Sequence, residues 1–102
     1  MASMSPTWRS DGLEAVADAL LRLRDRDEVL AFLRDLCTVG ELEALSHRLA
    51  AARLVDRGVP YAEIARSVGT STTTVTRVAH WLRHGEGGYR LALDRLAEQE
   101  PA

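Results

Sequence analysis

The chain has 102 residues, of which 46% are hydrophobic, and its formal net charge at pH 7 is −2. This length fits one small domain, and a monomer of this size buries only a limited share of its surface, so dimerisation is expected on size alone. The single cysteine, Cys37, excludes an internal disulfide framework and a multi-cysteine zinc site. We interpret it as a small buried hydrophobe rather than a reactive thiol.

Residues 1–11 contain no apolar segment typical of a signal peptide. No stretch approaches the roughly 20 apolar residues that cross a membrane, so we expect a cytoplasmic protein without a membrane partner. Residues 1–10, with Pro6 and small polar side chains, are interpreted as a disordered lead. Residues 11–98 are expected to form a single all-helical domain.

The rest of the chain predicts helices, because apolar residues recur at helical spacing and no segment alternates with the period of a strand. Asp25 with Glu28, and Thr38 with Glu41, have the spacing of capping boxes that start helices. Gly58 is placed to end the long third helix. Six helices are predicted, at about residues 11–24, 25–36, 38–57, 61–68, 71–83 and 89–98.

The third of these helices is expected to turn one apolar stripe towards the core. The stripe consists of Leu42, Leu45, Leu49, Ala52 and Val55. Three consecutive alanines at residues 50–52 would let another helix approach this one closely.

Residues 61–78 have the spacing of a helix-turn-helix. Ala65 suits the point where two short helices cross, because only a small side chain fits there. Gly69 suits the reversal of the chain, because glycine adopts the left-handed backbone conformation at low cost. The apolar positions that join the two helices are Ile64, Val68, Val75 and Val78.

The second helix of this motif predicts a surface that contacts DNA. Short hydroxyl side chains and a guanidinium can bond to base edges and phosphates in a major groove. The candidates are Thr72, Thr73 and Thr76 for base edges, Ser71 and Thr74 for phosphate at the helix N-terminus, Arg77 for either, and Arg53, Arg57 and Arg66 for positioning on the DNA backbone.

Each of these features has a simpler alternative. The spacing of alanine and glycine occurs by chance in helical proteins, and a threonine run after a turn can be only a capped, solvated helix. An arginine outside the motif can be a solvated surface charge or part of an ion pair within a helix.

The distribution of charge favours the DNA interpretation in spite of the net acidity. Residues 1–43 carry five Arg and nine acids (net −4), residues 44–84 six Arg and two acids (net +4), and residues 85–102 two Arg and four acids (net −2). The motif therefore lies in the basic segment, as expected for a surface that binds nucleic acid. His47, His80 and His84 lie in or beside this segment and add positive charge at lower pH.

Four stretches, at residues 32–38, 41–48, 69–78 and 85–90, carry a family resemblance. Asp-Leu-Cys-Thr in the first and Gly-x-Ser-Thr-x-Thr-Val-x-Arg-Val in the third are more specific than bare helix-turn-helix spacing. With them the chain resembles the Trp-repressor superfamily, and within it the YerC/YecD-type Trp-repressor-like proteins, over about residues 13–97. The resemblance implies a six-helix fold and an intertwined homodimer, whose helix-turn-helix units project about one DNA turn apart.

The founding member of that superfamily binds tryptophan as a corepressor. Thr38, Arg48 and Arg77 stand where the resemblance implies a ligand-facing threonine and two arginines. The residue after the second arginine is a glycine in that member, which leaves room for the indole, whereas here it is Val78. Since overfilling a packed site costs about 1–3 kcal/mol, we expect tryptophan not to bind and Thr38 to serve only as a helix cap.

These observations predict a sequence-specific DNA-binding transcriptional regulator, a repressor, that acts as a homodimer on double-stranded DNA without a cofactor. The alternative is a dimeric protein-interaction module that keeps the fold without specific DNA readout, which the net acidity and the absence of lysine leave open. An enzyme is not expected, because no nucleophile, base and metal set converges. His80 and His84 have the spacing of metal ligands on a helix, but without an evident third ligand no metal site is predicted.

Overall fold

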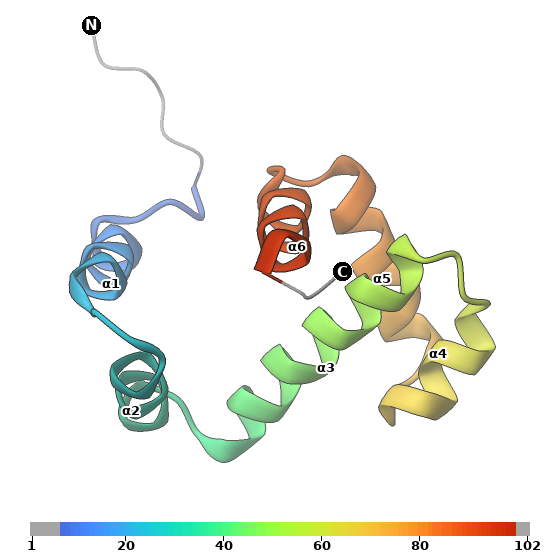
Figure 1. The fold of residues 1–102 in the computed structure, drawn as a ribbon, viewed down its shortest axis with the longest axis horizontal. Helices are drawn as coiled ribbons and strands as arrows, with labels where there is room; N and C mark the ends of the chain where they lie inside the picture. Colours follow the sequence, from blue (N-terminus) through green and yellow to red (C-terminus); the bar gives the residue numbers. More distant parts are fainter. Residues whose placement is uncertain (1–6, 100–102) are drawn as a thin grey trace, which may run out of the picture. The chain divides into compact units, whose positions relative to one another are not determined.

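The computed structural model describes residues 7–99, and over this range the chain is all-α, as predicted, with no strand. The helices are α1 (Asp11–Arg22), α2 (Arg26–Leu36), α3 (Val39–Asp56), α4 (Tyr61–Val68), α5 (Thr72–His84) and α6 (Gly88–Gln99) (Figure 1). Every predicted boundary lies within two residues of the observed one. Residues 1–6 of the predicted lead lie outside the described residues.

The chain divides into two compact units between Thr38 and Val39. The first unit holds α1 and α2, neither of which contains a buried residue, and Leu21 on α1 is 77% exposed. The second unit holds α3 to α6 and contains all the buried residues of the described chain. The first unit therefore has no core of its own.

Side-chain caps start both helices of the first unit. Ser10 accepts a hydrogen bond from the Leu13 N–H at 3.1 Å at the start of α1. Asp25 accepts one from the Glu28 N–H at 2.9 Å at the start of α2, which confirms the predicted cap. The Glu28 carboxylate bonds the N–H of Arg24 at 2.7 Å, one residue before the position expected in a capping box.

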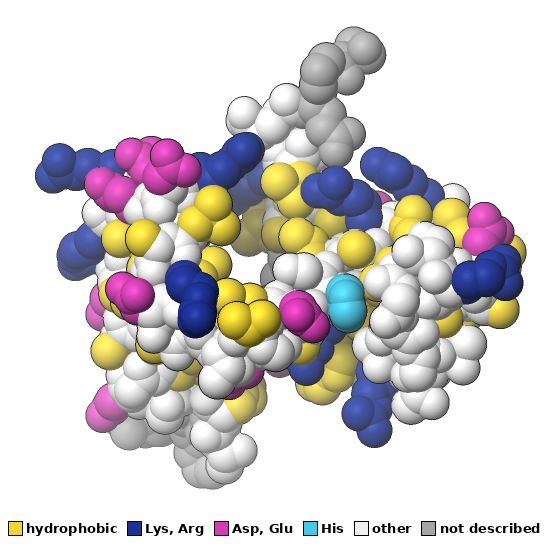
Figure 2. Space-filling view, turned by 90° about the horizontal axis from the view of Figure 1, so that it is seen from below, with side chains coloured by type: hydrophobic (Ala, Val, Ile, Leu, Met, Phe, Trp, Pro, Cys, Tyr) yellow, Lys and Arg dark blue, Asp and Glu magenta, His cyan; other side chains and the backbone are white. Residues whose placement is uncertain are grey.

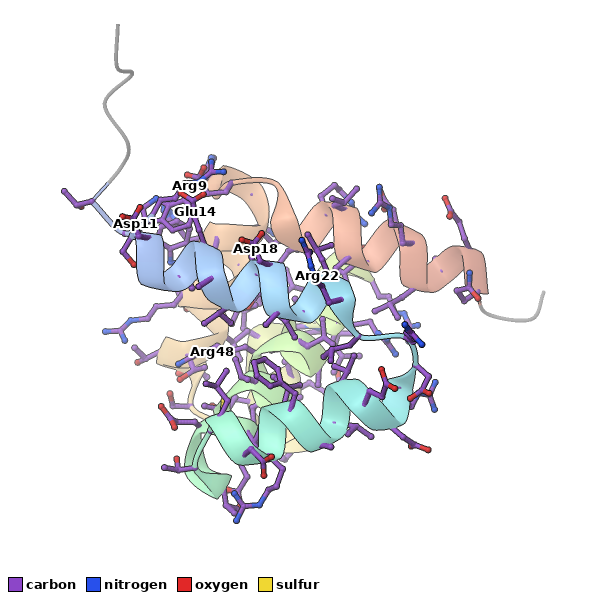
Figure 3. The ribbon with its side chains drawn as sticks, turned by 90° about the vertical axis from the view of Figure 1, so that its left-hand side faces the viewer. Arg9, Asp11, Glu14, Asp18, Arg22 and Arg48 are labelled. Carbon is purple, nitrogen blue, oxygen red and sulfur yellow. The ribbon has the colours of Figure 1, made fainter. Side chains whose placement is uncertain are left out.

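Charged side chains line part of the surface of α1 (Figure 3). Arg9 and Glu14 approach each other to 3.6 Å, and the Arg22 guanidinium donates to the Asp18 carbonyl at 3.3 Å. These contacts are exposed, so solvent screens them and they contribute little to stability.

The core of the second unit forms where α3, α4 and α5 meet, with α6 packed on α3 and α5 (Figure 1). Ala51, Ala52, Ile64 and Val75 are fully buried at this contact. The two alanines of α3 leave room for the backbones of α4 and α5 to approach closely, and the two branched side chains fill the remaining space. The other buried residues are Val55, Ala65, Val78, Ala79 and Leu93.

The predicted apolar stripe of α3 is only partly buried. Ala52 and Val55 are buried as expected, but Leu45 and Leu49 are 46% and 37% exposed. The reason is that the buried residues of α3 all lie in its C-terminal half, at Ala51, Ala52 and Val55. The N-terminal half of α3 therefore carries leucines that the rest of the second unit does not cover.

The helix-turn-helix predicted from residue spacing is present as α4 and α5. Gly69 ends α4 with a left-handed φ of 85°, and the N–H groups of Gly69 and Thr70 both donate to the Ala65 carbonyl at 3.0 Å. Arg83 near the end of α5 donates to the Tyr61 hydroxyl at the start of α4 at 3.0 Å. The turn and this hydrogen bond fix the angle between the two helices.

Replacement of Gly69 by alanine is expected to lower the free energy of unfolding by about 1–2 kcal/mol, because an L side chain is strained at this φ. A Cβ at Gly69 meets nothing within 4 Å, so backbone strain is the only cost. Gly88→Ala is the matched control: its Cβ also meets open space, but its φ is not left-handed. Urea unfolding of both variants measures the difference, and equal stabilities would contradict the argument.

Candidate nucleic-acid interface

The start of α5 presents a row of hydroxyl groups, three of which form hydrogen bonds within the helix or its cap. Ser71 caps the helix by accepting from the Thr74 N–H at 3.1 Å, and its hydroxyl also donates to the Thr74 hydroxyl at 3.1 Å. Thr76 donates to the Thr72 carbonyl at 2.9 Å, so it can still accept but its proton is committed. Thr72 and Thr73 are exposed, and their hydroxyls make no hydrogen bond within the described chain.

The arginines predicted to contact DNA differ in their surroundings. Arg77 on α5, Arg66 on α4 and Arg57 after α3 are exposed, and none of them forms an ion pair among residues 7–99. Arg53 on α3 is half-buried. Figure 2 shows that arginines project from the surface as several separate groups, between hydrophobic side chains that remain open to solvent.

A pocket of about 430 Å³ lies beside α5 in the second unit. It contains Arg48 and Arg77, two of the three residues predicted for a ligand pocket, whereas the third, Thr38, is an exposed residue at the end of the first unit. Val78 forms part of the wall and is 3% exposed. The lining residues are Ala44, His47, Arg48, Thr70, Thr74, Arg77, Val78, Trp81 and Tyr89.

The pocket is positively charged. Neither Arg48 nor Arg77 forms an ion pair or a side-chain hydrogen bond within the described residues, and no acidic side chain lines the pocket. Burial raises the pKa of the Tyr89 hydroxyl, and the charge of Arg48 opposes that shift. Tyr89 is therefore a protonated hydrogen-bond donor at neutral pH.

A salt-bridge cluster fixes α6 against α3. The guanidinium of Arg90 on α6 forms two hydrogen bonds to the carboxylate of Asp56 on α3, at 2.7 and 2.9 Å, and a salt bridge to Asp94 at 2.8 Å. The pKa of Asp56 is held below its ordinary value, mainly by the hydrogen bonds from Arg90 and against the opposing effect of burial. Because α6 also carries Tyr89, this cluster helps to position one wall of the pocket.

The rings of His80 and His84 lie with centroids 5.3 Å apart on α5. Among residues 7–99, no three His, Cys, Asp or Glu side chains are grouped so that they could hold a metal ion. Within the same range, no helix is long and apolar enough to span a membrane.

The family model of the Trp repressor protein matches residues 11–97. The chain belongs to the Trp repressor family. Its relative YerC, an uncharacterized protein of Bacillus subtilis strain 168, is 38% identical over 92 residues, which cover 90% of this chain and 88% of YerC. The predicted relationship to this family is confirmed.

Two crystal structures from the family share this fold. One is of a Staphylococcus aureus protein proposed to be a Trp repressor, with a TM-score of 0.81 and 40% identity over 88% of this chain and 90% of that one. The other is of a TrpR-like protein from Eubacterium eligens ATCC 27750, with a TM-score of 0.82 and 34% identity over 91% and 96%. Membership of this regulatory DNA-binding family agrees with the presence of the α4–α5 helix-turn-helix.

Four residues near the candidate interface were missed by the sequence analysis, namely Trp81, Tyr89, Arg90 and Asp94. Trp81 lies one helical turn beyond Arg77, so helical spacing could have placed it in the pocket. Tyr89 gave no such signal, because it reaches the pocket from a separate helix. Arg90 and Asp94 have the spacing of an intrahelix pair, but nothing in the sequence links either to Asp56, 34 residues before Arg90.

Replacement of Asp56 by asparagine is expected to destabilise the fold at neutral pH. A depressed pKa in the folded state means that the carboxylate stabilises the fold above its unfolded-state pKa, and that this stabilisation is lost as the pH falls below about 4. The difference in stability between wild type and Asp56→Asn should therefore shrink in that range. Urea unfolding from pH 7 to 3 measures it, and Glu98→Gln, which changes an exposed acid of α6, serves as the control. A difference that stayed constant with pH would contradict the assigned role.

Proposed function

We propose that this protein is a sequence-specific DNA-binding transcriptional repressor that acts as a homodimer. The observation that carries the proposal is the outer face of α5, where exposed hydroxyls and Arg77 follow a helix-turn-helix in the basic part of the chain. Such a helix fits the major groove, where short polar side chains meet base edges. The recognition helix, as α5 is called below, then contacts bases through its N-terminal half.

The hydrogen bonds within the recognition helix indicate which of its side chains contact bases and which contact phosphate. Thr72 and Thr73 have hydroxyls that can both donate and accept, so they contact base edges, and Thr76 contributes as an acceptor and through its methyl group. Ser71 and Thr74 contact phosphate beside the helix N-terminus. Arg77 contacts either a base edge or a phosphate, and the arginines that position the protein on the DNA backbone are Arg53, Arg57 and Arg66.

Uncovered apolar surface supports the homodimer. Neither helix of the first unit buries a residue, and Leu45 and Leu49 on α3 are also left open. A groove of about 380 Å³ along α1 is lined partly by Trp8, Leu13 and Leu21. A second copy of the chain carries the same exposed apolar side chains, so a two-fold symmetric dimer covers those of both copies at once. The single domain predicted for residues 11–98 is then complete only in the dimer.

Selection of bound sequences from a random duplex library at two salt concentrations tests this function. We expect a two-fold symmetric motif whose half-sites lie about one helical turn apart, together with a dimer in sedimentation equilibrium. Arg77→Ala should weaken binding to the selected site by about 1–3 kcal/mol if it contacts a base, or lower the salt dependence by about one ion if it contacts phosphate.

Arg95→Ala is the control for that experiment, because Arg95 is an exposed arginine of α6 outside the proposed interface. The repressor proposal would be wrong if the protein forms a dimer but enriches no sequence, and if its binding to DNA disappears as the salt concentration rises. That result would favour the alternative, a dimeric protein-interaction module that keeps the fold without specific readout.

We further propose that the regulator works without tryptophan. Val78 is nearly fully buried and forms part of the wall of the pocket, so its side chain occupies space that a glycine at this position would leave open for an indole. Val78 also joins the recognition helix to the core, which makes its displacement costly.

Addition of L-tryptophan is therefore expected to change the affinity for the selected duplex by less than about twofold, since the clash costs roughly 1–3 kcal/mol. Fluorescence anisotropy with labelled duplex measures this directly. A tenfold tightening of DNA binding at millimolar tryptophan would show that the pocket admits an indole in spite of Val78.

A further inference from the structure

The pocket beside the recognition helix holds two arginines without a counterion. Arg48 comes from α3 and Arg77 from α5, and neither is paired with another described residue. His47 lies on the same wall. Like charges that share a pocket repel each other, so an anion bound between them would replace a repulsion with two charge-assisted hydrogen bonds.

Neutral donors surround the same pocket from other elements. The Thr74 hydroxyl accepts from Ser71, which leaves its own proton free to donate. Thr70 contributes a hydroxyl from the turn, and Tyr89 contributes a protonated phenol from α6. Donors that arrive from three helices and a turn suit a tetrahedral anion, whose oxygens point in several directions, better than a planar ring or a single carboxylate.

We propose that this pocket binds a phosphate group, supplied either by the DNA backbone or by a free phosphate ester. The first source rests on the proposed DNA-binding function and deepens it. Thr74 and Arg77 lie one turn apart on the helix that also carries Thr72 and Thr73, so a phosphate held here lies next to the base-contacting side chains. A backbone phosphate in the pocket fixes the position of the recognition helix on the duplex.

The first experiment titrates inorganic phosphate into the full-length protein without DNA, followed by calorimetry and by the fluorescence of Trp81, which lines the pocket. Arg48→Gln is expected to weaken phosphate binding by about tenfold, because it removes a guanidinium group, which is charged and donates two parallel hydrogen bonds. Arg48→Lys keeps the positive charge but loses the bidentate geometry of the guanidinium, so it should weaken phosphate binding less. Arg95→Gln removes an exposed arginine outside the pocket and should leave binding unchanged.

The second experiment identifies the source of the phosphate with duplexes in which single phosphates are replaced by neutral methylphosphonates. If DNA supplies the group, neutralising one position weakens binding of the wild type but not of Arg48→Gln, and the salt dependence of Arg48→Gln falls by about one ion per protomer. If a free ester is the ligand, phosphate changes the DNA affinity of the wild type only, and every methylphosphonate has the same effect on both proteins.

The proposal is overturned if Arg48→Gln alters neither phosphate binding nor the salt dependence of DNA binding, while circular dichroism shows the variant folded. Failure of the proposed function is a separate result. If the protein binds phosphate through Arg48 but binds no duplex even at low salt, the proposed repressor function is wrong and the proposed anion site is supported.

Discussion

The close contact of α3 with α4 and α5 is the interaction on which the rest of the second unit depends. It exists because Ala51 and Ala52 bring no side-chain bulk to the crossing point, so that Ile64 and Val75 can fill it completely. Helices held this closely have little freedom to slide, since a packed interior tolerates changes of only about a methylene. The outer face of α5, the mouth of the pocket and the attachment of α6 all take their positions from this crossing.

The small amount of apolar surface buried within each unit explains why the chain is expected to need a partner. The second unit has a small core made mostly of alanine and valine, and the first has none. At about 25 cal/mol for each Å² of apolar surface buried, leucines left in solvent contribute nothing to folding. Leu21, Leu45 and Leu49 therefore stabilise the fold only when another surface covers them, and the proposed dimer links stability to protein concentration.

The sequence predicted best those features that local geometry determines. Gly69 could be placed in the turn because few residues adopt its φ, and Asp25 at a cap because few side chains bond the first free N–H groups. Contacts between distant segments were not predictable in this way. The Asp56–Arg90 salt bridge depends on where α6 packs, and the exposure of Leu45 depends on what covers α3, neither of which is encoded in the spacing of nearby residues.

Val78 contributes both to the core of the second unit and to the wall of the pocket. The side chain that seals the recognition helix against the core also forms part of the wall of the pocket, so the same methyl groups stabilise the fold and limit the space in the pocket. The pocket is lined by guanidinium and hydroxyl groups together with the exposed ring of Trp81. An anion bound between Arg48 and Arg77, as proposed above, would be recognised by charge and hydrogen bonds, and its effect on DNA binding would depend on salt, unlike that of a ligand held by burial of an aromatic ring.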